Sequence, residues 1–267
     1  MIKEPRRHNI LMNIRYYMNC QIWLKNFLIL ILISPFYLFS QNNMTKVYLF
    51  PGQGSDGRIF SNIKLDTSFQ KINVNYPVPA NGTTMKEYAA IISKQIDTTE
   101  KFILIGLSFG GMICTELADM LHPEKTIIIS SAKSRSELPK RYTVMKNYPA
   151  YKLYTKKFIK WGALLFQPQV EHQEHKDGEL FKSMLKDKDP QYLKQTFSMI
   201  INWDRTTYSP DIIHIHGSED RVLNIKNIKA DYIIDHGTHL MTYTRGEEIS
   251  KIIQNIFKKN KIISRQN

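Results

Sequence analysis

The chain has 267 residues, which is enough for one sizeable domain that carries an insertion. Hydrophobic residues make up 42% and charged residues 23%, a composition typical of a folded globular protein that excludes global disorder. The formal net charge is +13, but the lysines are spread along the chain and no RRM, KH or zinc-finger pattern gathers them. We therefore expect no nucleic-acid partner.

The first 43 residues are typical of an export leader. Basic residues end at Lys25, an apolar run of 13 residues covers 27–39, and a polar segment follows at 40–43. A bilayer-spanning helix needs about 20 residues, so the pattern favours a signal peptide and a periplasmic or secreted protein. A membrane anchor formed by residues 27–40 stays open, because residues 38–40 match the A-x-A cleavage pattern poorly. Met12 and Met18 are alternative start sites.

After the leader, short apolar runs alternate with helical patterns. The alternation predicts an α/β domain over residues 44–267, with a mostly parallel, doubly wound sheet. We expect strands at 46–50, 71–75, 102–105, 126–130, 211–215 and 231–234, and helices at 84–97, 109–121 and 247–258. Within the helix after the third strand, Met112 and Cys114 are expected in the core, and no second cysteine follows the leader to form an intrachain disulfide.

Residues 133–208 interrupt the alternation. They lack strand character, and the apolar spacing at 181–185 and 192–200 predicts helices, so we expect a helical cap inserted between two strands. The aromatic residues of this segment either line an apolar acyl pocket or pack the cap helices on each other, and the sequence leaves both open. These residues are Tyr142, Tyr148, Tyr151, Tyr154, Phe158, Trp161 and Phe166.

Residues 106–110 read G-L-S-F-G, the pattern G-x-S-x-G, between a predicted strand and a predicted helix. In that context the serine lies on a strained turn that projects its hydroxyl above the sheet, which makes Ser108 the predicted nucleophile. Gly106 and Gly110 relieve the crowding that side chains would cause at the turn. The helix N-terminus directs backbone N–H groups at developing negative charge.

A serine nucleophile needs a base, and the base needs an orienting acid. The candidates follow the last two predicted strands, at the sheet edge where the sites of parallel sheets form. For the acid, Asp220 competes with Glu219 and Asp235, and for the base, His239 competes with His236.

Together these segments resemble the α/β-hydrolase family over residues 46–258. Gly106–Gly110 is similar to its nucleophile elbow, residues 216–220 (H-G-S-E-D) to its H-G-x-x-D segment, and residues 237–239 (G-T-H) to its G-x-H segment. The resemblance favours Asp220 as the acid and His239 as the base, and implies no metal or organic cofactor. Asp220 and His239 are only 19 positions apart. This spacing is shorter than the family pattern implies, because it leaves little room for a helix between the two strands.

The stretch F-P-G-Q-G-S at residues 50–55 also resembles the opening signature of malonyl-CoA:ACP transacylases. Those enzymes carry G-H-S-x-G, whereas Leu107 precedes the serine here, and they lack the two C-terminal segments. In α/β-hydrolases the loop after this strand donates a backbone N–H to the oxyanion hole. We therefore expect the amides of Gln53 and Phe109 to form the hole, and Gly52 and Gly54 to let the loop turn tightly.

Other histidines carry weaker signals. His214 and His216 lie in a predicted strand, where structural imidazoles that form hydrogen bonds are expected. Residues 171–175 read E-H-Q-E-H, which we interpret as a solvated polar segment rather than a metal site, because a third ligand and the H-E-x-x-H order are missing.

The sequence thus predicts a serine hydrolase, esterase- or lipase-like, that forms an acyl-enzyme on Ser108 from a small-molecule or lipid ester. A thioesterase or an acyltransferase of the same fold is an alternative, since the same motif serves all of them. A second alternative is a non-catalytic homologue that binds a ligand, which the short spacing between Asp220 and His239 favours. The basic charge and the aromatic cap also suit peripheral contact with a membrane.

Overall fold

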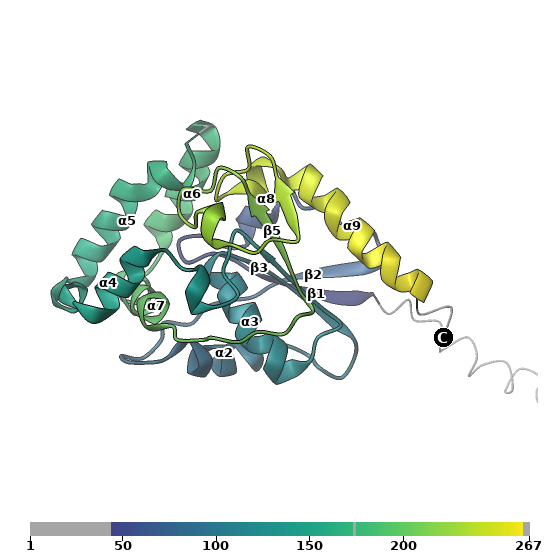
Figure 1. Ribbon diagram of the computed structural model, residues 1–267, viewed down its shortest axis with the longest axis horizontal. Coiled ribbons are helices and arrows are strands. Elements are labelled where there is room, and N and C mark those ends of the chain that lie inside the picture. Colours follow the sequence, from purple (N-terminus) through teal and green to yellow (C-terminus); the bar gives the residue numbers. More distant parts are fainter. Residues whose placement is uncertain (1–43, 173–174, 264–267) are drawn as a thin grey trace, which may run out of the picture. The chain divides into compact units, whose positions relative to one another are not determined.

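The computed structural model describes residues 44–172 and 175–263 (Figure 1). The expected leader lies outside the described residues. Residues 44–267 form one compact unit by themselves. Among the described residues, we find no helix that is both long and apolar enough to cross a bilayer.

A sheet of six parallel strands, in the order β2-β1-β3-β4-β5-β6, forms the centre of the fold. The strands are β1 (Thr45–Phe50), β2 (Phe69–Asn73), β3 (Phe102–Leu107), β4 (Lys125–Ile129), β5 (Ile212–Gly217) and β6 (Tyr232–Ile234). The predicted parallel sheet is confirmed, although β2 lies two residues earlier than its expected range of 71–75.

Alternating strand residues form two hydrophobic cores, one on each face of the sheet. Tyr48 and Phe50 of β1 face α2 (Met85–Ser93) and α3 (Phe109–Leu121). Val47 and Leu49 face the other side, where α9 (Gly246–Ile263) packs (Figure 1). Because helices cover both faces, β3 is buried along its whole length.

Short helical elements occur in the segments that follow β1, β5 and β6. The 3₁₀ helix η1 (Gly57–Phe60) follows β1, η4 (Ile225–Asn227) lies between β5 and β6, and the four-residue α8 (Met241–Thr244) precedes α9. The start of α2 is defined by a capping box, in which Thr84 and Glu87 each accept a hydrogen bond from the backbone N–H of the other.

Four helices and two 3₁₀ turns separate β4 from β5, in the segment where the sequence predicts a helical cap. The turns are η2 (Arg135–Glu137) and η3 (Ala150–Leu153), and the helices are α4 (Lys140–Asn147), α5 (Lys156–Val170), α6 (His175–Asp187) and α7 (Pro190–Asn202). In Figure 1 these helices lie together at one end of the sheet. We refer to α4–α7 as the cap.

Close packing requires a glycine at the start of α3. A Cβ atom at Gly110 would lie 2.1 Å from the carbonyl oxygen of Phe50 and 2.6 Å from that of Pro51. A Cβ atom at Gly106 would lie 2.5 Å from the carbonyl oxygen of Gly110. The first turn of α3 can therefore approach the ends of β1 and β3 only because side chains are absent at both positions.

Substituting Gly110 by alanine should lower the free energy of unfolding by at least ~1–3 kcal/mol, because backbone atoms must move to admit the methyl group. Gly162 in α5 is a matched control, since a Cβ atom there meets no atom within 4 Å. Gly162→Ala should raise the free energy of unfolding by ~0.5–1 kcal/mol through helix propensity. Urea unfolding of both variants tests this, and similar effects of the two substitutions would contradict it.

Candidate active site

Ser108 lies between the last residue of β3 and the first residue of α3, in a backbone conformation that few residues other than glycine adopt. Its φ is 52° and its ψ is −119°, which costs ~1–3 kcal/mol. Its N–H donates to the carbonyl of Ile129 at 2.9 Å, and its carbonyl accepts the hydroxyl of Ser131 at 2.7 Å. Neighbouring segments therefore hold the strained turn on both sides.

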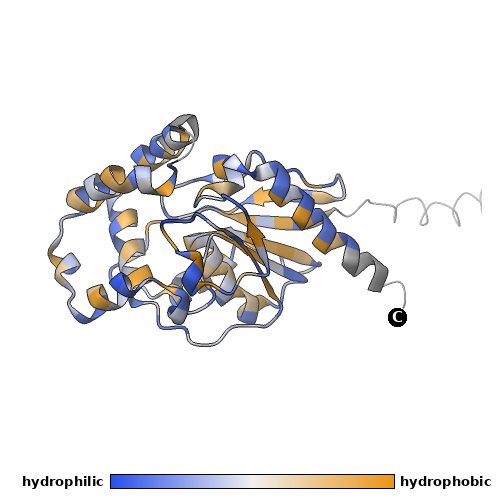
Figure 2. Ribbon diagram, turned by 45° about the horizontal axis from the view of Figure 1, so that its top comes forward, coloured by the Kyte–Doolittle hydropathy of each residue, from blue (hydrophilic) through white to orange (hydrophobic). Residues whose placement is uncertain are grey.

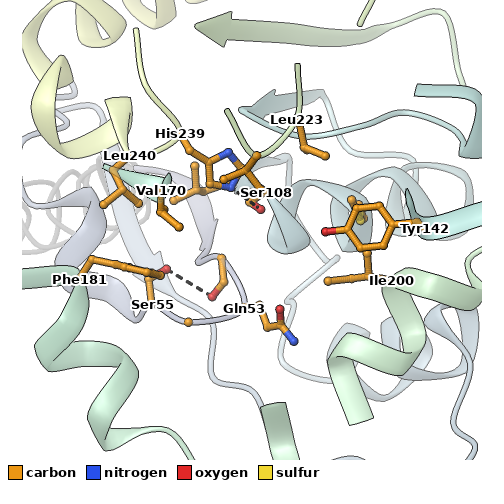
Figure 3. Close-up of a pocket in the computed structure, with 15 residues that line it drawn as sticks. Gln53, Ser55, Ser108, Tyr142, Val170, Phe181, Ile200, Leu223, His239 and Leu240 are labelled. Atoms are coloured by element: carbon orange, nitrogen blue, oxygen red, sulfur yellow. Dashed lines mark hydrogen bonds between the residues drawn. The ribbon is translucent and has the colours of Figure 1, made fainter. Parts of the chain in front are cut away.

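The structure brings Ser108, His239 and Asp220 into one hydrogen-bonded series. The Ser108 Oγ lies 2.9 Å from His239 Nε2 (Figure 3), and His239 Nδ1 lies 2.7 Å from Asp220 Oδ2. The three residues come from the ends of three strands, β3, β5 and β6, at the same edge of the sheet. Parallel strands place their carboxyl ends at one edge, so residues 131 positions apart in the chain come into contact.

The spacing of 19 positions between Asp220 and His239 is sufficient because β5 and β6 pair directly, and no α-helix lies between them. The two loops also touch: a Cβ atom at Gly217 would lie 2.1 Å from the carbonyl oxygen of Gly237. The N–H of Glu219 donates to that same carbonyl at 3.0 Å. The short connection thus draws the acid and the base together.

Asp220 is buried, with 2% of its surface exposed. Its Oδ1 accepts the backbone N–H groups of Val222 and Leu223, both at 2.8 Å. Burial raises the pKa of this carboxyl, but the charge and hydrogen bond of His239, the neighbouring His216 and the backbone N–H of Leu223 outweigh burial, so the pKa of Asp220 is below its usual value. An ionised Asp220 accepts a hydrogen bond from the N–H at His239 Nδ1, so the proton of the neutral ring stays on Nδ1 and Nε2 is free to accept from the Ser108 hydroxyl.

His216 and His214 form a second buried series behind the acid. His216 Nε2 donates to the carbonyl of Leu223 at 2.8 Å, and its Nδ1 lies 3.2 Å from His214 Nε2. A neutral His216 therefore accepts at Nδ1, and His214 donates from Nε2. His214 Nδ1 is buried and has no hydrogen-bond partner among the described residues, so the expectation that hydrogen bonds satisfy both rings is wrong for this atom.

The amides expected to form an oxyanion hole, those of Gln53 and Phe109, donate to no acceptor within the described residues. Phe109 is the first residue of α3, where the helix leaves backbone N–H groups unpaired. The side chain of Gln53 was not anticipated from the sequence: its Nε2 donates to the carbonyl of Leu193 at 3.0 Å and to the hydroxyl of Thr196 at 2.9 Å. The loop after β1 is therefore tied to α7 of the cap.

The loop after β1 does turn tightly at residues 52–55, where the N–H of Ser55 donates to the carbonyl of Gly52 at 3.1 Å. Neither Gly52 nor Gly54 has a positive φ, so neither supplies an unusual turn. A Cβ atom at Gly54 would lie 2.9 Å from the ring of Phe181, whereas one at Gly52 would make ordinary contacts of 3.4 Å or more. Gly54 makes room for α6, which the sequence of the loop alone does not reveal.

A cavity of about 130 Å³ opens beside Ser108 and His239. Each cap helix contributes one apolar or aromatic side chain that faces it: Tyr142 from α4, Val170 from α5, Phe181 from α6 and Ile200 from α7 (Figure 3). The cavity is thus built between the sheet edge and the cap, and its wall is mostly apolar.

The aromatic residues of the cap follow neither expected alternative as a group. Tyr142 lines the cavity, and Tyr151 is buried against Phe197, with ring centroids 6.0 Å apart. The remaining five are exposed: Tyr148, Tyr154, Phe158, Trp161 and Phe166. For these five both expectations are wrong, because hydrophobic spacing does not tell a helix face that meets the core from one that meets solvent.

The competing acids and base lie outside the site. His236 is 65% exposed, and its Nδ1 is 2.6 Å from Glu219 Oε1, while Asp235 is 87% exposed. Glu219 of this exposed pair is also 3.6 Å from His172 Nε2.

The segment at 171–175 differs from its expected solvated state where the structure describes it. Glu171 is buried and accepts the hydroxyl of Thr238 at 2.5 Å, which ties the end of α5 to the residue before His239. Residues 173–174 lie outside the described part. Within the described ranges, no group of three or more metal-ligating side chains comes together.

No protein-family model matches the chain, and no curated protein matches its sequence. Solved structures do match. An esterase from Thermogutta terrifontis superposes with a TM-score of 0.64 at 16% identity, over 80% of this chain and 90% of that one. The chain has the α/β-hydrolase fold.

Two further α/β-hydrolase structures match to a similar degree. An enol-lactonase from Burkholderia xenovorans superposes with a TM-score of 0.64 at 14% identity, over 81% of this chain and 92% of that one. An esterase from Exiguobacterium antarcticum superposes with a TM-score of 0.61 at 18% identity, over 80% of this chain and 92% of that one. At these identities the likeness concerns the fold alone.

The buried His214 should make the stability of the protein depend on pH. Burial, and then the neighbouring His216 and Lys133, lower the pKa of His214 well below its usual value. The unfolded chain takes up a proton below about pH 6.5 while the folded chain does not, so stability is complete above that pH and falls as the pH decreases. His214→Gln should therefore show a smaller drop in melting temperature between about pH 7.5 and about pH 5 than the wild type.

His122→Asn, a substitution of an exposed histidine, is the control and should leave the drop unchanged. Thermal melts followed by circular dichroism measure both. An equal drop in the wild type and in His214→Gln would show that His214 does not carry this pH dependence.

Proposed function

We propose that the protein is a serine carboxylic-ester hydrolase that acts through an acyl-enzyme on Ser108. The observation that carries the proposal is the hydrogen-bonded series from Ser108 Oγ through His239 to Asp220, with distances of 2.9 and 2.7 Å. A hydroxyl on a strained turn, next to an imidazole held in one tautomer by a buried carboxylate, is the arrangement that acyl transfer needs.

In the acylation step, His239 Nε2 takes the proton of the Ser108 hydroxyl while Oγ forms a bond to the ester carbonyl carbon. The carbonyl oxygen becomes an oxyanion that the unpaired amides of Gln53 and Phe109 would stabilise. Asp220 stabilises the imidazolium that forms. The bond to the alcohol then breaks, and the alcohol leaves with the proton from His239.

In the deacylation step, His239 takes a proton from water, and the water oxygen attacks the acyl carbon. The bond to Ser108 breaks, Oγ regains its proton from His239, and the carboxylic acid is released. In both steps Ser108 and His239 act at the cavity that they line, while Asp220 acts from behind His239.

The same geometry favours an enzyme over a binding protein. A non-catalytic homologue would tolerate a serine and a histidine beyond hydrogen-bond reach, so the 2.9 Å contact favours the enzyme. Esterases and an enol-lactonase among the similar structures support ester chemistry over other acyl chemistry. A thioesterase or an acyltransferase would use the same three residues and differ in the substrate alone.

Ser108→Ala should reduce turnover of p-nitrophenyl butyrate by at least about 10³-fold, because no other group can form the acyl-enzyme. It should also abolish labelling by a fluorophosphonate probe. Ser61→Ala, which changes an exposed serine, is the control and should keep both activities. A wild-type protein that is folded but neither labels nor hydrolyses any such ester would refute the proposed function.

The size of the cavity predicts a preference for short acyl chains. Its volume of about 130 Å³ is close to that of an engineered cavity of ~150 Å³ that binds benzene. We expect kcat/KM to be at least about tenfold higher for p-nitrophenyl acetate or butyrate than for the dodecanoate. Phe181→Ala, which removes a ring from the cavity wall, should move this preference toward longer chains.

The comparison uses the ratio of kcat/KM values within each variant, so a loss of stability does not affect it. A wild-type enzyme that prefers the dodecanoate would show that the cavity does not limit the acyl chain.

A further inference from the structure

The outer face of the cap exposes an unusual concentration of large hydrophobic side chains. Of the twelve that are exposed in the described part of the chain, eight lie within residues 144–166. We call this set the outer cap surface. It consists of Val144, Tyr148, Leu153, Tyr154, Phe158, Trp161, Leu165 and Phe166.

The centre of the outer cap surface is a continuous stripe on α5. Phe158, Trp161 and Leu165 follow each other at intervals of three and four residues, so they project from the same side of the helix. Their exposed fractions are 48%, 57% and 59%. The ring of Phe158 lies 4.9 Å from that of Tyr154 and 5.7 Å from that of Trp161, between centroids.

The other side of α5 faces the core, where Ile159 and Ala163 pack among the partly buried residues. The stripe is therefore not needed to hold the helix in place. The hydropathy colouring shows that apolar residues occur along the helices of the cap as well as in the sheet (Figure 2). Water-soluble monomers rarely expose contiguous apolar surface of this kind without a binding partner.

The segment of the chain that carries the outer cap surface has charged side chains of a single sign. Residues 138–170 contain seven lysines and arginines and no aspartate or glutamate. Five of the seven are exposed lysines that form no ion pair within the described residues: Lys140, Lys146, Lys152, Lys156 and Lys157. The expected partner of the outer cap surface is thus both apolar and negatively charged.

A bilayer with anionic headgroups has both properties. Aromatic and aliphatic side chains enter the region between headgroups and acyl chains, while lysines reach the phosphates. A second copy of this face would bring two lysine-rich surfaces together, and their like charges would oppose the contact. We propose that the outer cap surface docks the protein on a bilayer that carries anionic lipids.

Docking in this way would place the cavity close to the membrane. α4 carries Tyr142 toward the cavity and Val144 on the outer cap surface, and α5 does the same with Val170 and Trp161. The proposal goes beyond the proposed function and does not rest on it, because binding to vesicles requires no turnover.

The test uses a chain that begins at Met44. Every buried residue of the two cores lies within residues 47–257, and residues 44–267 form a compact unit, so this part has a complete core of its own. It lacks the apolar run at 27–39, which would bind lipid independently. The vesicles are phosphatidylcholine alone, or phosphatidylcholine mixed with phosphatidylglycerol.

Two readouts are measured. Co-sedimentation gives the bound fraction, which should be high on the mixed vesicles, low on phosphatidylcholine alone, and reduced by added salt. Tryptophan emission reports insertion, because Trp161 is 57% exposed whereas Trp203 is only 3% exposed. The emission should move to shorter wavelength when the mixed vesicles are added.

Two double variants test separately the apolar side chains of the outer cap surface and the lysines beside them. Phe158→Ser with Leu165→Ser, and Lys156→Glu with Lys157→Glu, should each weaken binding by at least about 20-fold. The matched controls are Ile91→Ser with Ile233→Ser for the apolar pair, and Lys94→Glu with Lys101→Glu for the basic pair. All four positions are exposed and lie outside the cap. These controls should bind as the wild type does.

Ser108→Ala should also bind as the wild type, so a failed hydrolase assay and a failed docking assay remain distinct results. The proposal is overturned if the wild type does not bind the mixed vesicles, or if the controls lose as much binding as the cap variants. It is also overturned if the wild type is a dimer in sedimentation velocity that Phe158→Ser with Leu165→Ser dissociates. In that case the outer cap surface is an interface between two copies.

Discussion

The close approach of α3 to the end of β1 is the contact on which the rest of the site depends. The absence of a side chain at Gly110 lets the first turn of α3 lie against the carbonyl of Phe50. The chain must then turn within one residue, and this forces Ser108 into its positive φ. The buried strand β3 and the hydrogen bonds to Ile129 and Ser131 stabilise a conformation that is unfavourable by itself.

A buried carboxylate is stable at this edge because the loops supply its hydrogen-bond donors. Asp220 accepts two backbone N–H groups as well as His239, so its charge is compensated although water is excluded. The same loops leave His214 and His216 neutral and buried. The fold thus keeps one ionised carboxylate close to two neutral imidazoles, and of their four ring nitrogens His214 Nδ1 alone lacks a hydrogen-bond partner among the described residues.

The two surfaces of the cap differ in what they contact and in their composition. Its inner side closes the cavity with one residue from each helix, and it is tied to the sheet loops through Gln53 and through the contact of Glu171 with Thr238. Its outer side is apolar and basic. α4 and α5 each contribute a side chain to both surfaces, so the cavity wall and the outer side share these two helices.

The sequence by itself determined the alternation of strands and helices, the glycines around Ser108 and the order of Ser108, Asp220 and His239, because local periodicity and turn chemistry depend on neighbours in the chain. It could not decide whether 19 residues suffice to join the acid and the base, which side of α5 meets solvent, or that Gln53 reaches α7. Only the tertiary structure decided these points. They depend on which strands pair and which helices pack, and distant residues create those contacts without leaving a local pattern.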